Sequence, residues 1–199
     1  MDQTEARLRS GKTIREVCDT AELTEEAIAL FGGGRGGLEF LKLLVEAEHY
    51  PDAVRFLAHA LPKREAVWWA WTCARQAAGE EPPEEIQASL EATQRWIAEP
   101  TDELRRAAME RAQEADVGTA AGAVGLAVFL CGESIAPPER EAVPPAESLA
   151  ARAISASIML AAVSEEPERA GEKYHDFLHR GERVAERVQI WHPPEEPHE

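Results

Sequence analysis

Two histidines near the carboxyl end of the chain are the residues best suited to metal chemistry. His175 and His179 are four positions apart in EKYHDFLHRGERVAERV, and Glu172 and Glu182 each lie three positions beyond one of them. On a helix, offsets of three and four place these side chains on one face, where imidazoles and a carboxylate can ligate zinc. The string HDFLH differs from the zinc-hydrolase signature HExxH because Asp176 replaces the general-base glutamate. A solvated polar helix face explains the same residues, and we prefer that interpretation.

A run of basic and aromatic residues, LPKREAVWWAWTCARQ, forms a second candidate site. Its cations, Lys63 and Arg64, fall in the first turn of an expected helix, where each opposes the helix dipole by about 0.3–1 kcal/mol. Either they pair internally with carboxylates or aromatic faces, or they form the rim of a site for an acidic or aromatic segment of a protein partner. Arg35, inside the run GGGRGG, is a further candidate contact for a partner.

Three tryptophans follow these cations within four positions: Trp68, Trp69 and Trp71. Trp68 and Trp71 share one helix face, whereas Trp69 points about 100° away, so the helix is apolar over more than half its circumference. We therefore predict a central helix with Trp68 and Trp71 buried under helix 117–131 or helix 167–188. Buried indole N–H groups should donate to carbonyls or acidic side chains. If an open groove exposes the rings instead, all three tryptophans become candidate binding residues.

Two glycine-containing motifs resemble phosphate-binding loops but lack the structural context of such loops. ARLRSGKT ends in Gly11, Lys12 and Thr13, yet only five residues precede it, where a phosphate-binding loop follows a buried strand. GGGRGG satisfies GxGxxG but follows a helical pattern. Thr13 and Glu16 instead have the spacing of a capping box at a helix start. We expect no nucleotide and no other cofactor.

The composition excludes several classes of partner. The 199 residues include 37 Asp and Glu against 21 Lys and Arg, a formal charge of −16. Such a surface repels phosphate backbones and anionic lipids, so we expect neither nucleic acid nor a membrane as partner. The most apolar run, 117–131, is shorter than the roughly 18 residues of a membrane span. The three cysteines show no CxxC pair and no even framework, and the amino terminus has no secretory signal, which favours a cytoplasmic location.

Apolar residues recur at spacings of three and four along nearly the whole chain. This pattern, without alternating β-branched runs, predicts an all-α protein of about eight or nine helices and no sheet, packed as a compact bundle or an irregular helical array. The expected organisation is a polar N-terminal segment at 1–12, a main helical lobe at 13–133, a Pro-rich linker at 134–148, a C-terminal helical pair at 149–190 packed on the main lobe, and an acidic Pro-rich tail at 191–199.

FLAHALPKREAVWWA, followed by CGESIAPPEREAVPP and an alanine-rich helix, resembles a bacterial family of unknown function. Its members share an ALPKREAVWWA-like string and an APP…PP linker, and the resemblance extends from about Ile14 to Val188. It implies an all-helical fold and a link to a bacterial secretion apparatus. It implies no activity and assigns no residue a role.

We expect a non-catalytic, cytoplasmic protein-binding module that acts as an adaptor, a chaperone or an accessory subunit. An acidic surface keeps such a protein soluble, and grooves between helices can hold a helix or an extended peptide. The alternative function is a metal-binding module or a metal-dependent enzyme that uses the His175/His179 helix face. The sequence leaves the oligomeric state open.

Overall fold

The computed structural model describes residues 7–32 and 35–192 of the chain. Within these ranges the structure contains ten α-helices, nine of them with seven or more residues, and no β-strand, which confirms the all-α prediction. One isolated β-bridge joins Arg7 to Thr13. The helices are α1 (Ile14–Thr20), α2 (Glu25–Ala29), α3 (Gly37–Glu46), α4 (Tyr50–Ala60), α5 (Lys63–Ala78), α6 (Glu84–Ala98), α7 (Asp102–Glu114), α8 (Ala120–Leu130), α9 (Leu149–Val163) and α10 (Ala170–Arg187), with a 3-10 helix, η1 (Pro167–Arg169), before α10.

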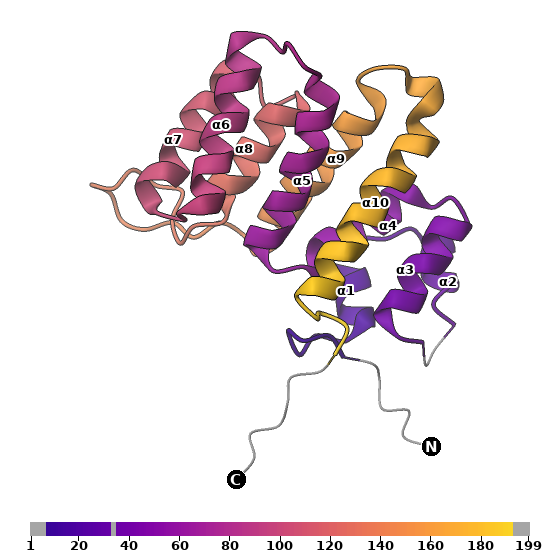
Figure 1. The fold of residues 1–199 in the computed structure, drawn as a ribbon. Coiled ribbons are helices and arrows are strands. Elements are labelled where there is room, and N and C mark those ends of the chain that lie inside the picture. The colour runs from indigo at the N-terminus through magenta and orange to yellow at the C-terminus, as the bar shows by residue number, and fades with distance from the viewer. Residues whose placement is uncertain (1–6, 33–34, 193–199) are drawn as a thin grey trace.

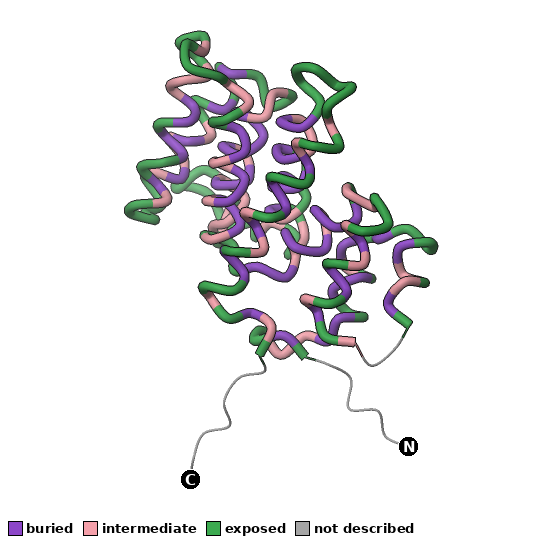
Figure 2. Tube along the Cα trace, turned by 45° about the vertical axis from the view of Figure 1, so that its right-hand side comes forward, coloured by how far each residue is buried: buried purple, intermediate pink, exposed green. Residues whose placement is uncertain are grey.

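The helices form two groups joined by the last two helices of the chain. Figure 1 shows α5 to α9 side by side in one group, with α1 to α4 in the other. α10 packs against α4, α5 and α9, and α9 packs against α4, α5 and α8, so both helices bridge the groups. Figure 2 shows buried residues concentrated where the helices face one another. The hydrophobic core therefore continues from one group into the other.

Helix α8 lies at the centre of the larger group, as its apolar sequence predicts. It contacts α5, α6, α7 and α9. Gly125 allows α7 to approach closely, because a Cβ atom there would lie 3.1 Å from the carbonyl oxygen of Ala108 and 2.8 Å from the Cβ of Ala112. The small residue thus permits close helix packing.

Side-chain caps set the starts of several helices. The Thr13 hydroxyl accepts a hydrogen bond from the Glu16 N–H at 3.1 Å, and the Thr13 N–H donates to the Glu16 carboxylate at 2.7 Å. This is the predicted capping box at the start of α1. Thr24, Thr101 and Thr119 cap α2, α7 and α8 through their hydroxyl groups in the same manner. Local sequence therefore accounts for where these helices begin.

The described residues include only part of the predicted non-helical segments. The predicted linker at 134–148 contains no helix. Buried Arg105 of α7 holds its start, because the guanidinium donates to the Ser134 carbonyl at 2.9 Å. Residues 1–6 of the predicted N-terminal segment, 33–34 of the glycine run and 193–199 of the predicted tail lie outside the described residues.

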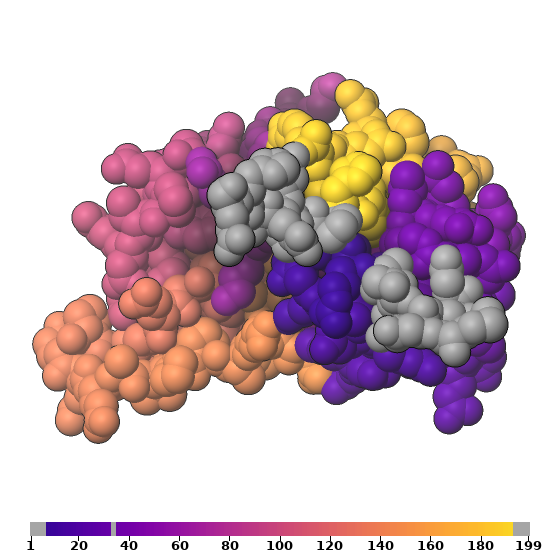
Figure 3. Space-filling model, turned by 90° about the horizontal axis from the view of Figure 1, so that it is seen from below, coloured from indigo at the N-terminus to yellow at the C-terminus, as the bar shows by residue number. Residues whose placement is uncertain are grey.

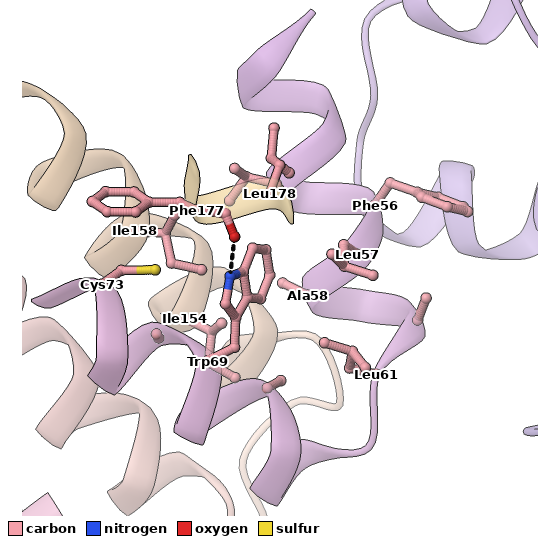
Figure 4. Packing of buried hydrophobic residues seen from close by; sticks show 14 of the residues in the cluster. Phe56, Leu57, Ala58, Leu61, Trp69, Cys73, Ile154, Ile158, Phe177 and Leu178 are labelled. Carbon is pink, nitrogen blue, oxygen red and sulfur yellow. Dashed lines mark hydrogen bonds between the residues drawn. The ribbon is translucent and has the colours of Figure 1, made fainter. Parts of the chain in front are cut away.

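The tryptophans of α5 are oriented differently from the prediction. Trp69 is the fully buried indole, at 0% exposure, and its Nε1–H donates to the Phe177 carbonyl at 2.7 Å. Figure 4 shows this ring enclosed by side chains from α4, α9 and α10. Trp68 and Trp71 are half-buried, and Trp71 donates to the Leu90 carbonyl of α6 at 2.9 Å. Trp68 and Trp71 pack against the core but are less buried than Trp69, because the helices that seal the core meet on the Trp69 side of α5.

Candidate functional site

Two of the three basic candidates, Arg35 and Arg64, donate hydrogen bonds to backbone carbonyls of the chain itself. Arg64 donates to the carbonyls of Ile97 at 2.8 Å and Ala98 at 3.2 Å, at the end of α6. Arg35 donates to the Leu30 carbonyl at 2.9 Å, just after α2. Both guanidiniums thus satisfy carbonyls that a helix end leaves without partners. For Arg64, these partners are backbone carbonyls and not the carboxylates or aromatic faces that we expected, and they offset its unfavourable position in the first turn of α5.

The third candidate is Lys63, whose cavity has no tryptophan in its lining. It is exposed and lines a cavity formed with the N-terminal segment and the start of α9. The structure therefore does not bring Lys63 and Arg64 together with Trp68 into one basic and aromatic site.

The histidine face of α10 is solvated and carries ion pairs. His175 and His179 are exposed. Glu172 pairs with Arg169 at 3.0 Å, and Glu182 pairs with Lys42 at 3.5 Å. Across residues 7–32 and 35–192, no group of three or more His, Cys, Asp and Glu side chains is arranged to hold a metal ion. The metal-ligating alternative therefore has no supporting geometry in the described part of the chain.

A groove between α5 and α10 combines one tryptophan with three arginines, and we call it the Trp68 groove. Its volume is about 430 Å³, and it is lined by Trp68, Thr72, Arg180, Arg183, Val184 and Arg187. On α5 the two lining residues are four positions apart, and on α10 the arginines follow one another at offsets of three and four. These spacings place each set on a single helix face. The packing of α10 against α5 brings the two faces together.

The arginines of the Trp68 groove differ in how they are paired. Arg180 forms an ion pair with Asp176 at 2.7 Å. Arg187 stands over the Trp68 ring, with its Cζ 5.1 Å from the ring centroid, a cation–π distance. Among the described residues, no carboxylate lies within ion-pair distance of Arg183 or Arg187, although α10 forms ion pairs elsewhere. The groove thus presents two guanidiniums without a carboxylate partner in the described part of the chain, and one of them, Arg187, stands over the indole.

The groove has the chemistry of a recognition site. A guanidinium presents a planar fork of N–H donors that matches a carboxylate, and an indole face accepts an aromatic, apolar or cationic group. Trp68 is half-buried, so part of its ring remains accessible. Arg183 and Arg187 are exposed, so their donors can reach a ligand. The groove can therefore hold an acidic group and an apolar or aromatic group side by side.

The sequence analysis identified Trp68 as a candidate but did not identify the arginines of α10. It singled out Trp68 but grouped it with Trp69, Trp71 and the cations at the start of α5. Trp69 lies in the core, and Trp71 faces α6. The missed signal was RGERVAER, whose arginines share one helix face. Nothing in the sequence indicated that this face would meet α5.

The cysteines do not provide nucleophiles. Burial raises the pKa of the Cys73 thiol to about 12 and that of Cys18 to about 12. The same effect raises the pKa of Cys131 to about 11. Because the thiolate is the reactive form, all three side chains remain protonated and weakly reactive near neutral pH.

Fold and site together define an all-helical protein with a tryptophan–arginine groove between two long helices. The chain belongs to the Family of unknown function (DUF6931), which it matches over residues 40–185. That range includes Trp68, Arg180 and Arg183 of the groove, and it confirms the expected membership of an uncharacterised family. Comparison with curated proteins and with solved structures gave no match. None of the described helices has the length and apolar character needed to span a membrane.

Proposed function

We propose that the protein is a non-catalytic binding module that holds an acidic segment of a partner protein in the Trp68 groove. The observation that carries this proposal is the pair of guanidiniums, Arg183 and Arg187, that have no carboxylate partner among the described residues. An acidic segment would supply the missing carboxylates. An apolar or aromatic side chain of the same segment would cover the accessible part of the Trp68 ring.

The charge distribution favours selective binding over nonspecific binding. The formal charge of −16 repels acidic proteins at long range. At physiological ionic strength that repulsion is screened beyond about 8 Å, whereas direct guanidinium–carboxylate contacts persist at short range. Only a segment that reaches into the groove and matches the arginines would overcome the surrounding negative charge. This selectivity suits an adaptor, a chaperone or an accessory subunit.

The cellular setting is part of the same proposal. We infer a bacterial, cytoplasmic protein, with a secretion apparatus as the candidate setting. The support is the resemblance of the ALPKREAVWWA string and the APP…PP linker to a bacterial family, together with the strongly acidic composition. The family to which the chain belongs is described without a function.

The test combines affinity capture with a photo-crosslinker at Thr72, which lines the groove and is half-buried. Capture from the native host with the full chain should recover a partner, and the cross-link should map to an acidic segment of it. Arg183→Glu with Arg187→Glu should weaken that complex by about tenfold or more, since truncated or reversed hot-spot contacts commonly cost over 1 kcal/mol. Circular dichroism should show that the double variant remains folded.

A matched control is a double variant that makes the same change in charge at two arginines outside the groove. Arg75 and Arg95 are exposed and do not line the groove, so Arg75→Glu with Arg95→Glu should leave the complex intact. Equal loss of binding in both double variants would attribute the effect to net charge and refute the proposed site. A cross-link to a basic or neutral segment would refute the proposed chemistry of the partner.

A further inference from the structure

A second cavity lies where the N-terminal segment meets α1, the α4–α5 corner and the start of α9. Its volume is about 430 Å³. In Figure 3 the indigo N-terminal segment borders the orange part of the chain, and Lys12 joins these two parts through an ion pair with Glu147 at 2.5 Å. We call this the N-terminal cavity. Its volume falls in the range of about 300–1,000 Å³ that is usual for small-molecule sites.

The polar wall of the N-terminal cavity carries excess positive charge. Three cations, Arg9, Lys12 and Lys63, line it, with Glu147 as the single carboxylate. Lys12 pairs with that carboxylate, and Arg9 donates to the Val188 carbonyl at 2.9 Å. Lys63 has no ion-pair partner within the described ranges. The cations exceed the carboxylates by two, from three against one.

Two helix starts add to this electropositive character. Lys63 is the first residue of α5, and Ser148 directly precedes α9. The N-cap residues Pro62 and Ser148 both line the cavity, and neither caps its helix through a side-chain hydrogen bond. Helix N-termini present N–H groups and a partial positive charge, which favour a bound anion. These helix starts reinforce the cations of the same wall.

His59 lines the cavity and has a buried ring nitrogen without a hydrogen-bond partner among the described residues. Its Nδ1 lies 2.8 Å from the Arg55 carbonyl oxygen, which can only accept, so Nδ1 carries the proton. Nε2 of the neutral ring is then an acceptor, and it is buried without a hydrogen-bond partner in the described structure. An unpaired buried acceptor costs about 1–3 kcal/mol.

We propose that the N-terminal cavity binds a small phosphate monoester with an apolar body. The dianionic phosphate matches the excess of two cations, with Lys63 and the adjoining helix starts as its main contacts. The apolar body lies against Leu61, Ile154 and Ile190, which also line the cavity. This site is distinct from the Trp68 groove, since the two have no lining residue in common.

The turn that borders the N-terminal cavity does not have the structure of the phosphate-binding loop that ARLRSGKT resembles in sequence. Residues 7–13 form a tight turn closed by the bridge between Arg7 and Thr13, with Gly11 at a φ of 82°. The Leu8 N–H donates to the Lys12 carbonyl at 2.9 Å. This turn places Arg9 and Lys12 at the cavity. A phosphate-binding loop, in contrast, joins a buried strand to a helix.

The test is isothermal titration of the full chain with phenyl phosphate, which joins a phosphate monoester to a compact apolar ring. Phenyl phosphate should bind, inorganic phosphate should bind more weakly, and benzyl alcohol should not bind. Lys63→Ala should lower the affinity for phenyl phosphate by about tenfold or more, which is the loss expected when a charge-assisted hydrogen bond is removed. Ala151→Leu should also block binding, because it fills the cavity without changing charge.

The control is Lys42→Ala, which removes an exposed lysine of α3 away from the cavity and should leave binding unchanged. Absence of heat with phenyl phosphate, or unchanged affinity in Lys63→Ala, would overturn the proposal. Benzoate binding as tightly as phenyl phosphate would overturn the assignment of a phosphate. The Arg183→Glu, Arg187→Glu variant should retain phenyl phosphate binding, so failure of this site and failure of the Trp68 groove are distinguishable.

Discussion

Truncation of Trp69 should be among the most damaging single changes to the core. The ring is fully buried, and its N–H donates to the Phe177 carbonyl at 2.7 Å. Removal of a large aromatic side chain from a core costs about 3–5 kcal/mol, and the lost hydrogen bond adds about 1 kcal/mol. We therefore expect Trp69→Ala to lower the free energy of unfolding by about 4–6 kcal/mol, a substantial part of the usual 5–15 kcal/mol.

The assay is urea denaturation, with thermal unfolding as a second measurement. For a chain of this length, about 2–4 °C of Tm is lost per kcal/mol, so Trp69→Ala should lower Tm by about 8–24 °C. Trp68→Ala is the matched control on the same helix. Because Trp68 is less buried than Trp69 and no hydrogen bond of its indole is seen within the described residues, we expect a smaller effect. Trp69→Phe, which keeps an aromatic ring, should fall between the two and remains measurable if Trp69→Ala does not fold.

Equal destabilisation by Trp69→Ala and Trp68→Ala would refute this reasoning. It would mean that the Trp68 and Trp69 faces of α5 are equally closed to solvent. A loss below about 2 kcal/mol for Trp69→Ala would also contradict it, because that is less than the range for a filled core position.

Two further predictions concern helix packing and pH. Gly181→Ala should destabilise the protein by about 1–3 kcal/mol in urea denaturation, because the added Cβ would lie 2.6 Å from the Leu57 side chain and from the Trp69 ring. Gly171→Ala in the same helix, with its nearest atom 3.8 Å away, should be neutral or slightly stabilising, and similar losses in both variants would contradict the packing argument. Burial lowers the pKa of His59, so the unfolded chain binds its proton more readily and stability should fall as pH drops below about 6.5. His59→Gln should weaken that pH dependence in unfolding titrations, and an unchanged slope would show that other groups cause it.

The local structure of this protein follows from sequence features that act over a few residues. Thr13 and Glu16 form a capping box because both partners lie within one turn of α1. The apolar residues of 117–131 and Gly125 predict a central helix, because small and apolar side chains allow packing on several sides. The all-α class and the start of α1 could therefore be predicted from the printed sequence alone.

Only the tertiary structure decided which faces of these helices meet. An apolar majority on α5 did not indicate whether Trp68 or Trp69 would be buried, because that depends on where α4, α9 and α10 pack. The position of Arg64 likewise depended on the end of α6, more than thirty residues away. The Trp68 groove joins α5 to Arg183 and Arg187, over one hundred residues later, and no helical period links positions so far apart. Sequence spacing determines the face on which a side chain lies, whereas long-range packing determines what that face contacts.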